Sequence, residues 1–298
     1  MRSRKFPLKE WRAISIPPNA RGVMLLTFDL EECEKFRERK PESVRIKHPD
    51  KDGEELDMFS LSLSGAERIL ELLEVAGVKS TFFVTVSFAT RYPEFINLLH
   101  AKEHEIGFHA VEHGDNYKLL WFKEPERCLL RLKKGKEFLE RVVGTEVIGF
   151  RAPQLQAPPV NGLKKAGFIY DSSLHPTYVP GRYNNLFETR HIIEKDEFYE
   201  VPISVTPLFR LPISWYWFRN LGLNYVKLCT RWVMKSSGYC NLYFHPWDFY
   251  PLTNFEFLPS HYKKNTEKMP EMFEDYLNWC RKRGFIFSTV RSWLQKLK

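Results

Sequence analysis

The feature that most constrains this chain is an alternation between short apolar runs and amphipathic stretches with helical spacing. Residues 23–28 (V-M-L-L-T-F) form one continuous apolar run, and residues 80–86 form another that is rich in β-branched and aromatic side chains. Shorter runs follow at residues 147–150 and 241–244. Apolar runs without polar alternation are typical of strands that are covered on both faces. The alternation therefore predicts a parallel α/β sheet or barrel.

The stretches between the runs carry helix signals. Ser64 and Glu67 form a capping-box pattern in front of an apolar stripe, which predicts a helix that begins there. Pro125 suits the first turn of a long amphipathic helix that ends near Gly144. A final helix is expected from about residue 266 to residue 283.

Length and composition favour one large domain. The chain has 298 residues, of which 43% are hydrophobic and 15% aromatic, enough to bury a large core. Residues 1–20 are polar and proline-bearing and are predicted to form an N-terminal arm, with a single domain at 21–298. Residues 33–63 are charged and aperiodic and are interpreted as a lid or a solvated insertion. The strongly aromatic stretch at about 206–238 is interpreted as a second insertion.

Charge and hydropathy bear on partners and location. The formal net charge of +8 is spread along the chain, which favours a phosphorylated substrate or an anionic lipid surface over nucleic acid. Most aromatics between Phe209 and Trp232 are expected to pack, although their neighbours Arg210 and Arg219 would also suit a segment that touches lipid. We see no apolar run of spanning length and no secretory signal at the start, so we predict a cytoplasmic protein with no evident protein partner and leave peripheral contact with a membrane as an open alternative.

The cysteines do not suggest a disulfide framework. There are five, an odd number, and none forms a C-x-x-C pair. We expect reduced, mostly packed thiols.

Two histidines four residues apart are the first sign of a metal site. His109 and His113 follow a short apolar stretch, and a helical turn after that stretch would place both imidazoles on one face. By themselves they could equally be hydrogen-bonded core residues or solvated surface residues. Acidic residues at the end of the run at 23–28, Asp29 and Glu31 among them, favour the metal interpretation.

Five motifs then occur in a definite order. They are T-F-D-L-E at 27–31, H-A-V-E-H at 109–113, R-A-P at 151–153, D-S-S at 171–173 and Y-F-H-P-W at 243–247. This set resembles the NodB-homology polysaccharide deacetylases, carbohydrate esterase family four, over most of the chain. The form F-H-P-W-D resembles the branch associated with bacterial surface-polysaccharide loci. The resemblance implies a distorted (β/α) barrel of about seven strands and one divalent cation, usually zinc.

The resemblance also implies roles for individual residues. His109 and His113 match the metal-binding pair of the family, and Asp29 matches its general base. Arg151 matches the arginine that pairs with that base, and His245 matches the general acid. Hydrolysis of an acetamide needs an activated water, a stabilised oxyanion and a proton for the departing amine, and these residues suit those tasks.

The acid motif departs from the common family form, in which two aspartates are adjacent and the second binds the metal. Here Leu30 separates Asp29 from Glu31, which leaves open which acid is the base and which is the ligand. We favour Asp29 as the base and Glu31 as the metal ligand, with Glu32 as a solvated neighbour.

Three further residues are predicted to contact substrate or to shape its pocket. The backbone N–H of Gln154 is a candidate donor to the oxyanion. Asp171 would orient His245 by accepting its second N–H, or would cap a turn formed with the two serines that follow it. Trp247 would stack on a sugar face or pack in the core.

The predicted activity is removal of an acetyl or formyl group from an amino sugar in a saccharide or in a nucleotide- or polyprenyl-linked saccharide. A second hypothesis places a non-sugar amide or imide in the same barrel, as in allantoinase-like relatives. A third is a carbohydrate-binding protein without catalysis on the same scaffold.

Overall fold

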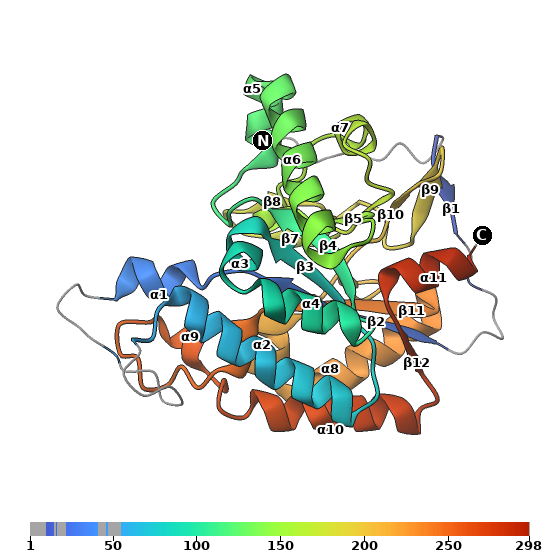
Figure 1. Cartoon of the computed structure of the whole chain (residues 1–298). Helices are drawn as coiled ribbons and strands as arrows, with labels where there is room; N and C mark the ends of the chain where they lie inside the picture. The colour runs from blue at the N-terminus through green and yellow to red at the C-terminus, as the bar shows by residue number, and fades with distance from the viewer. Residues whose placement is uncertain (1–9, 15, 17–21, 41–45, 47–54, 298) are drawn as a thin grey trace.

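The central strand of the fold is β2 (Val23–Leu30), which is buried along its whole length. The computed structural model describes residues 10–14, 16, 22–40, 46 and 55–297 (Figure 1). On one side β2 pairs with β11 (Tyr239–Phe244), and on the other with β12 (Ile286–Ser288) and then β3 (Thr81–Thr85). All three neighbours are parallel to β2, as the apolar runs predict for a strand covered on both faces.

The sheet continues away from β3 through four more parallel strands. They are β4 (Glu105–Ala110), β5 (Gly149–Phe150), β6 (Tyr170–Asp171) and β10 (Phe198–Glu200). Beyond them β9 (Ile193–Lys195) and β1 (Arg12–Ala13) pair antiparallel. The chain after β10 returns toward β11, where the Ser204 N–H donates to the Asn241 carbonyl oxygen at 2.9 Å. The sheet is thus curled into an incomplete barrel, which confirms the predicted fold class.

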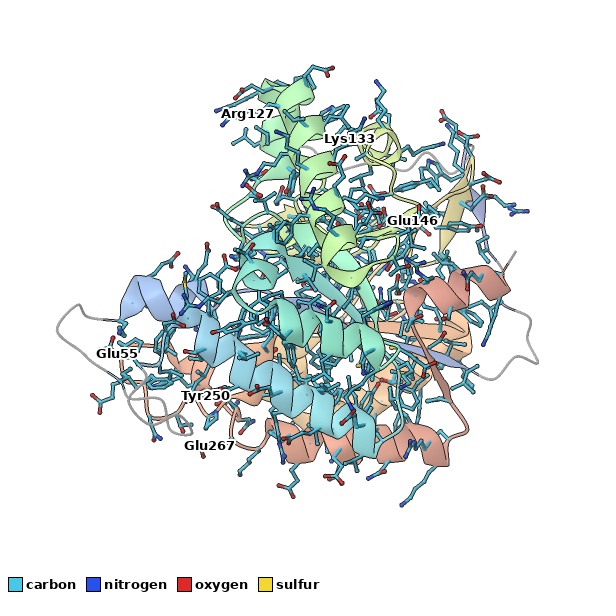
Figure 2. The ribbon with its side chains drawn as sticks, viewed as in Figure 1. Glu55, Arg127, Lys133, Glu146, Tyr250 and Glu267 are labelled. Atoms are coloured by element: carbon cyan, nitrogen blue, oxygen red, sulfur yellow. The ribbon has the colours of Figure 1, made fainter. Side chains whose placement is uncertain are left out.

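The helices pack mainly on the outside of this curl. They are α1 (Glu34–Arg39), α2 (Met58–Val75), α3 (Val86–Arg91), α4 (Pro93–Ala101), α5 (Tyr117–Lys123), α6 (Pro125–Val143), α7 (Val160–Lys165), α8 (Trp215–Ser237), α9 (Ser260–Lys263), α10 (Met269–Lys282) and α11 (Val290–Lys296). Figure 1 shows α2, α4 and α6 in front of the strands, with α10 along the lower edge. Charged side chains such as Arg127 and Lys133 project outward from α6 in Figure 2. None of the helices in the described ranges is long and apolar enough to cross a membrane.

The alternation of side chains along β2 separates the core from the site. Met24, Leu26 and Phe28 belong to the large apolar cluster under the helices, where Phe28 stacks on Phe82 with ring centroids 5.0 Å apart. Val23 and Leu25 belong to a second cluster inside the curl. Each such fully buried large side chain contributes about 1.5–3 kcal/mol to folding. By the same two-residue period, Thr27 and Asp29 face the inside of the barrel.

Helix α2 begins six residues before the predicted capping box. Its N-cap is Asp57, whose carboxylate accepts from the N–H groups of Phe59 at 2.9 Å and Ser60 at 2.7 Å. The Ser60 hydroxyl in turn accepts from the Asp57 N–H at 2.9 Å. The predicted start at Ser64 is wrong because its pattern lies inside the helix, whose first turns are buried.

The stretches predicted as insertions take more regular forms. Residues 206–238 contain α8, a helix that packs beside β11 and is interrupted at Gly222, where φ is 80°. Residues 33–63 contain α1 and the first turn of α2, while 41–45 and 47–54 lie outside the described residues. Positions 1–9, 15 and 17–21, which include most of the predicted arm, also lie outside them.

Two smaller predictions are confirmed. Helix α6 runs from Pro125 to Val143 and ends at Gly144, whose φ of 68° explains why a glycine stands there. All five cysteines are buried free thiols.

Candidate active site

The carboxyl ends of the parallel strands meet at one edge of the barrel, where a buried ion pair lies. Asp29, near the end of β2, accepts from Arg151, which follows β5, at 2.8 Å. Arg151 is fully buried and also donates to the hydroxyl of Thr27 and to both oxygens of Ser172 at 2.7–2.9 Å. Burial raises the pKa of Asp29, but the Arg151 guanidinium and nearby imidazoles outweigh it, so the pKa of Asp29 is lowered. Asp29 is therefore a rigidly held, ionised carboxylate.

A second cluster joins β2 to β4. The Glu31 carboxylate contacts Nε2 of His109 at 2.8 Å and Nε2 of His113 at 3.3 Å. His109 lies on β4, and His113 lies in the turn that follows, so the predicted helical turn between them is absent. The turn is braced by Asp115, which accepts from the N–H groups of Val111 and Glu112 at 3.2 Å. The two imidazoles therefore converge through a strand end and a tight turn.

The hydrogen-bond partners of the imidazoles show what this cluster lacks. Nδ1 of His109 lies 2.8 Å from the carbonyl oxygen of Arg151, which only accepts, so Nδ1 must carry a proton. Its Nε2 then faces a carboxylate and needs either a second proton or a cation. His113 lies between Glu34 at Nδ1, 2.8 Å away, and Glu31 at Nε2. Burial opposes charging of His113, yet these carboxylates raise its pKa to about 9.

The cluster therefore favours positive charge at one buried point. Among the residues that the structure describes, no three His, Cys, Asp or Glu side chains already form a metal site, and Glu31 contacts both imidazoles directly. The donor set itself fits a divalent cation, because two imidazoles and a carboxylate are common ligands of zinc. Glu31, His109 and His113 are the residues that would hold it.

His245 lies across from this cluster in an extended conformation, with φ −117° and ψ 153°, as Pro246 predicts. Its Nε2 is 3.8 Å from Glu31, and its ring stacks on Trp247 with centroids 4.4 Å apart. Trp247 is buried, so much of its face packs on the imidazole. The ring of His245 is thereby fixed in one orientation.

The acid beside His245 is Asp248 and not the predicted Asp171. Asp248 accepts from the backbone N–H of His245 at 2.9 Å and lies 3.7 Å from its Nδ1. Asp248 is itself fully buried and paired with Arg219 of α8 at 2.8 Å. Asp171 accepts from the N–H and hydroxyl of Ser173, which is the turn-capping alternative. The pairing of Asp248 with Arg219 is not visible in the sequence, because Arg219 is 29 positions before Asp248.

Glu32 and Glu34, which follow Glu31 closely in the chain, were not predicted to contribute to the site. Glu32, predicted to be solvated, is buried and accepts from the hydroxyls of Ser87 at 2.9 Å and Thr85 at 3.2 Å. That prediction is wrong because the chain turns inward between β2 and α1, which gives Glu32 a polar niche at the end of β3. Glu34, which had no predicted role, contacts His113. The acidic run itself was the only signal for either residue.

Seven of the nine predicted site residues line one cavity of about 200 Å³. They are Asp29, Glu31, His109, His113, Gln154, His245 and Trp247. Arg151 and Asp171 are not among the residues that line it, and both are fully buried. Gln154 is exposed, and its φ of 50° is unusual for a residue with a side chain. A larger hollow of about 960 Å³ lies between α8 and the amino ends of β2 and β11, without a comparable set of acids and histidines.

Two family models match consecutive parts of the chain. A family model described as polysaccharide deacetylase matches residues 58–168, and a domain of unknown function (DUF3473) matches residues 172–290. Over residues 58–168 the chain is therefore similar to the polysaccharide deacetylases. Among curated proteins, YheN of Bacillus subtilis (strain 168), described as a candidate polysaccharide deacetylase, is 26% identical over 108 residues. That alignment covers 35% of this chain and 37% of YheN.

Solved structures support the fold. A candidate polysaccharide deacetylase from Mycobacterium smegmatis matches with a TM-score of 0.54 and 21% identity, over 89% of this chain and 87% of that one. PuuE allantoinase matches with a TM-score of 0.58 and 16% identity, over 94% and 91%. BA3943 of Bacillus anthracis, described as a CE4 family pseudoenzyme, matches with a TM-score of 0.51 and 15% identity, over 93% and 66%. At these identities the likeness concerns the fold alone.

Proposed function

We propose that this chain is a metal-dependent hydrolase that removes an N-acetyl group, or alternatively a formyl group, from an amino sugar. The observation that carries the proposal is a single cavity that combines three elements. These are the Asp29–Arg151 pair, the cluster of Glu31 with two imidazoles, and His245. The general activity of the family, hydrolytic deacetylation, supports the same chemistry.

The chain's own residues suit the proton transfers of amide hydrolysis. Asp29, kept ionised by Arg151, accepts a proton from the attacking water. His245, held by Trp247 and by the backbone contact to Asp248, donates a proton to the departing nitrogen. A divalent cation, when bound, polarises the substrate carbonyl and lowers the pKa of a bound water.

The size of the cavity bears on the substrate. A volume of about 200 Å³ is below the roughly 300–1,000 Å³ of pockets for drug-sized ligands. We infer that the acetamido group and part of its sugar enter, while the remainder of a saccharide stays outside. The backbone N–H of Gln154, at the wall of the cavity, is the proposed oxyanion donor. The cytoplasmic location and the identity of the sugar carrier stay predictions.

The first test measures bound metal and product release together. Purified protein is analysed for metal by mass spectrometry, and acetate release is followed on a panel of acetylated amino sugars. We expect His113→Ala to lose metal and activity, because one of two imidazole ligands is removed. Full metal content in that variant would contradict the ligand set.

The roles of the two acids are separated by a matched pair of isosteric variants. Asp29→Asn should keep the metal and lose activity, because the amide cannot accept the proton. Glu31→Gln should lose the metal. The opposite pattern would exchange the two roles, which the sequence left open.

The same assays address the alternatives. Ureido and imide substrates test hydrolysis of a non-sugar amide, an alternative kept by the likeness to PuuE allantoinase. A protein that binds no metal after reconstitution and releases no product would instead support a carbohydrate-binding relative without catalysis, as the pseudoenzyme neighbour illustrates.

A further inference from the structure

Five large apolar side chains are exposed on the loops between β6 and α8. Phe187 is 91% exposed, Leu208 82% and Phe209 66%, and Tyr178 and Leu211 are also exposed. We refer to these five residues as the apolar rim. Apolar groups gathered at one place on a surface mark interaction sites, whereas scattered ones are ordinary.

Hydrogen bonds bring the separate parts of the rim together. The Thr177 hydroxyl donates to the carbonyl oxygen of Arg210 at 2.7 Å. The Arg210 guanidinium donates to the carbonyl oxygen of Glu188 at 3.0 Å, and the Asn185 N–H donates to the carbonyl oxygen of Thr177 at 2.9 Å. The joined residues include the chain neighbours of Tyr178, Phe187 and Phe209, so three apolar side chains project from one tied set of loops.

The same loops form part of the mouth of the candidate active site. Strands β7 (Tyr178–Val179) and β8 (Tyr183–Asn184) make a hairpin that begins at the rim. Arg182 and Tyr183, at the other end of this hairpin, line the 200 Å³ cavity. The Tyr183 hydroxyl is anchored 2.8 Å from Nδ1 of the buried His175. The rim is thus continuous with the cavity wall.

We propose that the apolar rim docks on an anionic membrane surface and so presents the cavity to a lipid-linked saccharide. The presentation of substrate rests on the proposed function, whereas the docking does not. Arg210 lies between Phe209 and Leu211 of the rim, Arg182 lies in the hairpin at the cavity mouth, and the chain carries a formal net charge of +8. Aromatic and leucine side chains on loop ends, mixed with arginine, suit the boundary between lipid headgroups and acyl chains.

The rim includes only the start of the segment that the sequence suggested for lipid contact, because Phe209 and Leu211 belong to both. Arg219, one of the cations of that segment, is fully buried against Asp248. Leu221, Leu228 and Trp232 of α8 are exposed, but Leu228 and Trp232 border the larger hollow beyond the amino ends of the strands. Docking through α8 would face the cavity away from the lipid.

The test is co-sedimentation of the full chain with vesicles of mixed phosphatidylcholine and phosphatidylglycerol, compared with phosphatidylcholine alone. We expect binding to the anionic vesicles that weakens as salt is raised. The double variant Phe187→Ser, Phe209→Ser should reduce partitioning at least about tenfold, because burial of even one phenylalanine is worth that factor. Phe122→Ser, which alters a phenylalanine 85% exposed on α5, is the matched control and should bind like the unaltered protein.

Several outcomes would overturn the proposal. The first is that the protein does not bind the vesicles, and the second is that Phe122→Ser reduces vesicle binding as much as the rim variant does. The third is that Trp232→Ser reduces vesicle binding whereas the rim variant does not. The fourth is that sedimentation velocity shows self-association through the rim. Acetate release from a soluble acetylated sugar is measured in parallel, and the rim variant should match the unaltered protein. If no sugar is hydrolysed but vesicle binding still requires the rim, the proposed function fails and the docking stands.

Discussion

A glycine under the loop of His245 offers a sharp test of how the site is positioned. Gly65 lies inside α2, where the helix passes η2 (Pro246–Phe249). A Cβ added at Gly65 would lie 2.0 Å from the carbonyl oxygen of Pro246 and 2.6 Å from its carbonyl carbon. Both atoms are backbone, so Gly65→Ala can be accommodated only if η2 or the helix moves.

The expected effect on activity exceeds the effect on stability. Ordinary contact begins near 3.4 Å, so the Pro246 carbonyl must retreat by about 1.4 Å. Overpacking of this kind costs about 1–3 kcal/mol, offset by about 1 kcal/mol because alanine favours the helix. The net loss of up to about 2 kcal/mol lowers Tm by only a few degrees. His245 precedes Pro246 directly, and a misplacement of about 1 Å costs a reaction on the order of a hundredfold.

The assay compares Gly65→Ala with Glu71→Ala, an exposed position of the same helix. Acetate release, bound metal and Tm are measured for both. We expect the Gly65 variant to keep its metal, since the proposed ligands lie on β4 and on the segments that follow β2 and β4, and to lose about a hundredfold in kcat. Unchanged kcat would refute the argument that α2 sets the position of His245.

Two other predictions concern residues away from the cavity. Arg131→Gln removes the guanidinium that binds the Asp115 carboxylate at 2.8–3.0 Å and should lower metal affinity about 10- to 100-fold, because that carboxylate braces the histidine turn. Titration against a chelator measures the metal affinity, and an unaltered affinity would contradict the role of Asp115 in bracing the turn. Burial lowers the pKa of His104 from 6.5 to about 4. Between these pH values the unfolded chain binds a proton that the folded chain does not, so the free energy of unfolding is highest above pH 6.5 and falls as pH drops toward 4. The decrease is up to about 1.4 kcal/mol per pH unit. His104→Asn keeps an acceptor for the Ser80 N–H, which lies 3.1 Å from Nδ1, and should flatten this pH dependence in urea unfolding; a slope like that of the unaltered protein would contradict it.

The fold was largely predictable because its signals are local. The run at 23–28 is apolar at nearly every position, which only a strand covered on both faces requires, and α6 is bounded by Pro125 and Gly144. Where the sequence misled, a local pattern had two solutions. Ser64 matches a capping box as well as Asp57 does, and only burial of the first turns decides between them.

The candidate site divides in the same way. Residues at the carboxyl end of a strand, such as Asp29, Arg151 and His245, were identifiable because parallel strands bring these ends to one edge. Glu34 was not, because its contact with His113 depends on how α1 leaves the sheet. Asp171 was favoured as the acid that orients His245, whereas the acid beside this imidazole is Asp248, three residues further along the chain.

The pairing of Asp248 with Arg219 shows why an aromatic helix matters to the chemistry. A buried carboxylate without a partner is costly, and removal of one member of such a pair typically costs about 3–5 kcal/mol. Arg219 satisfies Asp248 and also donates at 2.8 Å to the carbonyl oxygens of Tyr262 and Lys264, which ties α8 to the segment before α10. The position of His245 therefore depends on a helix that its sequence indicates only as packing or lipid contact, and such a dependence can be found only once the tertiary structure is known.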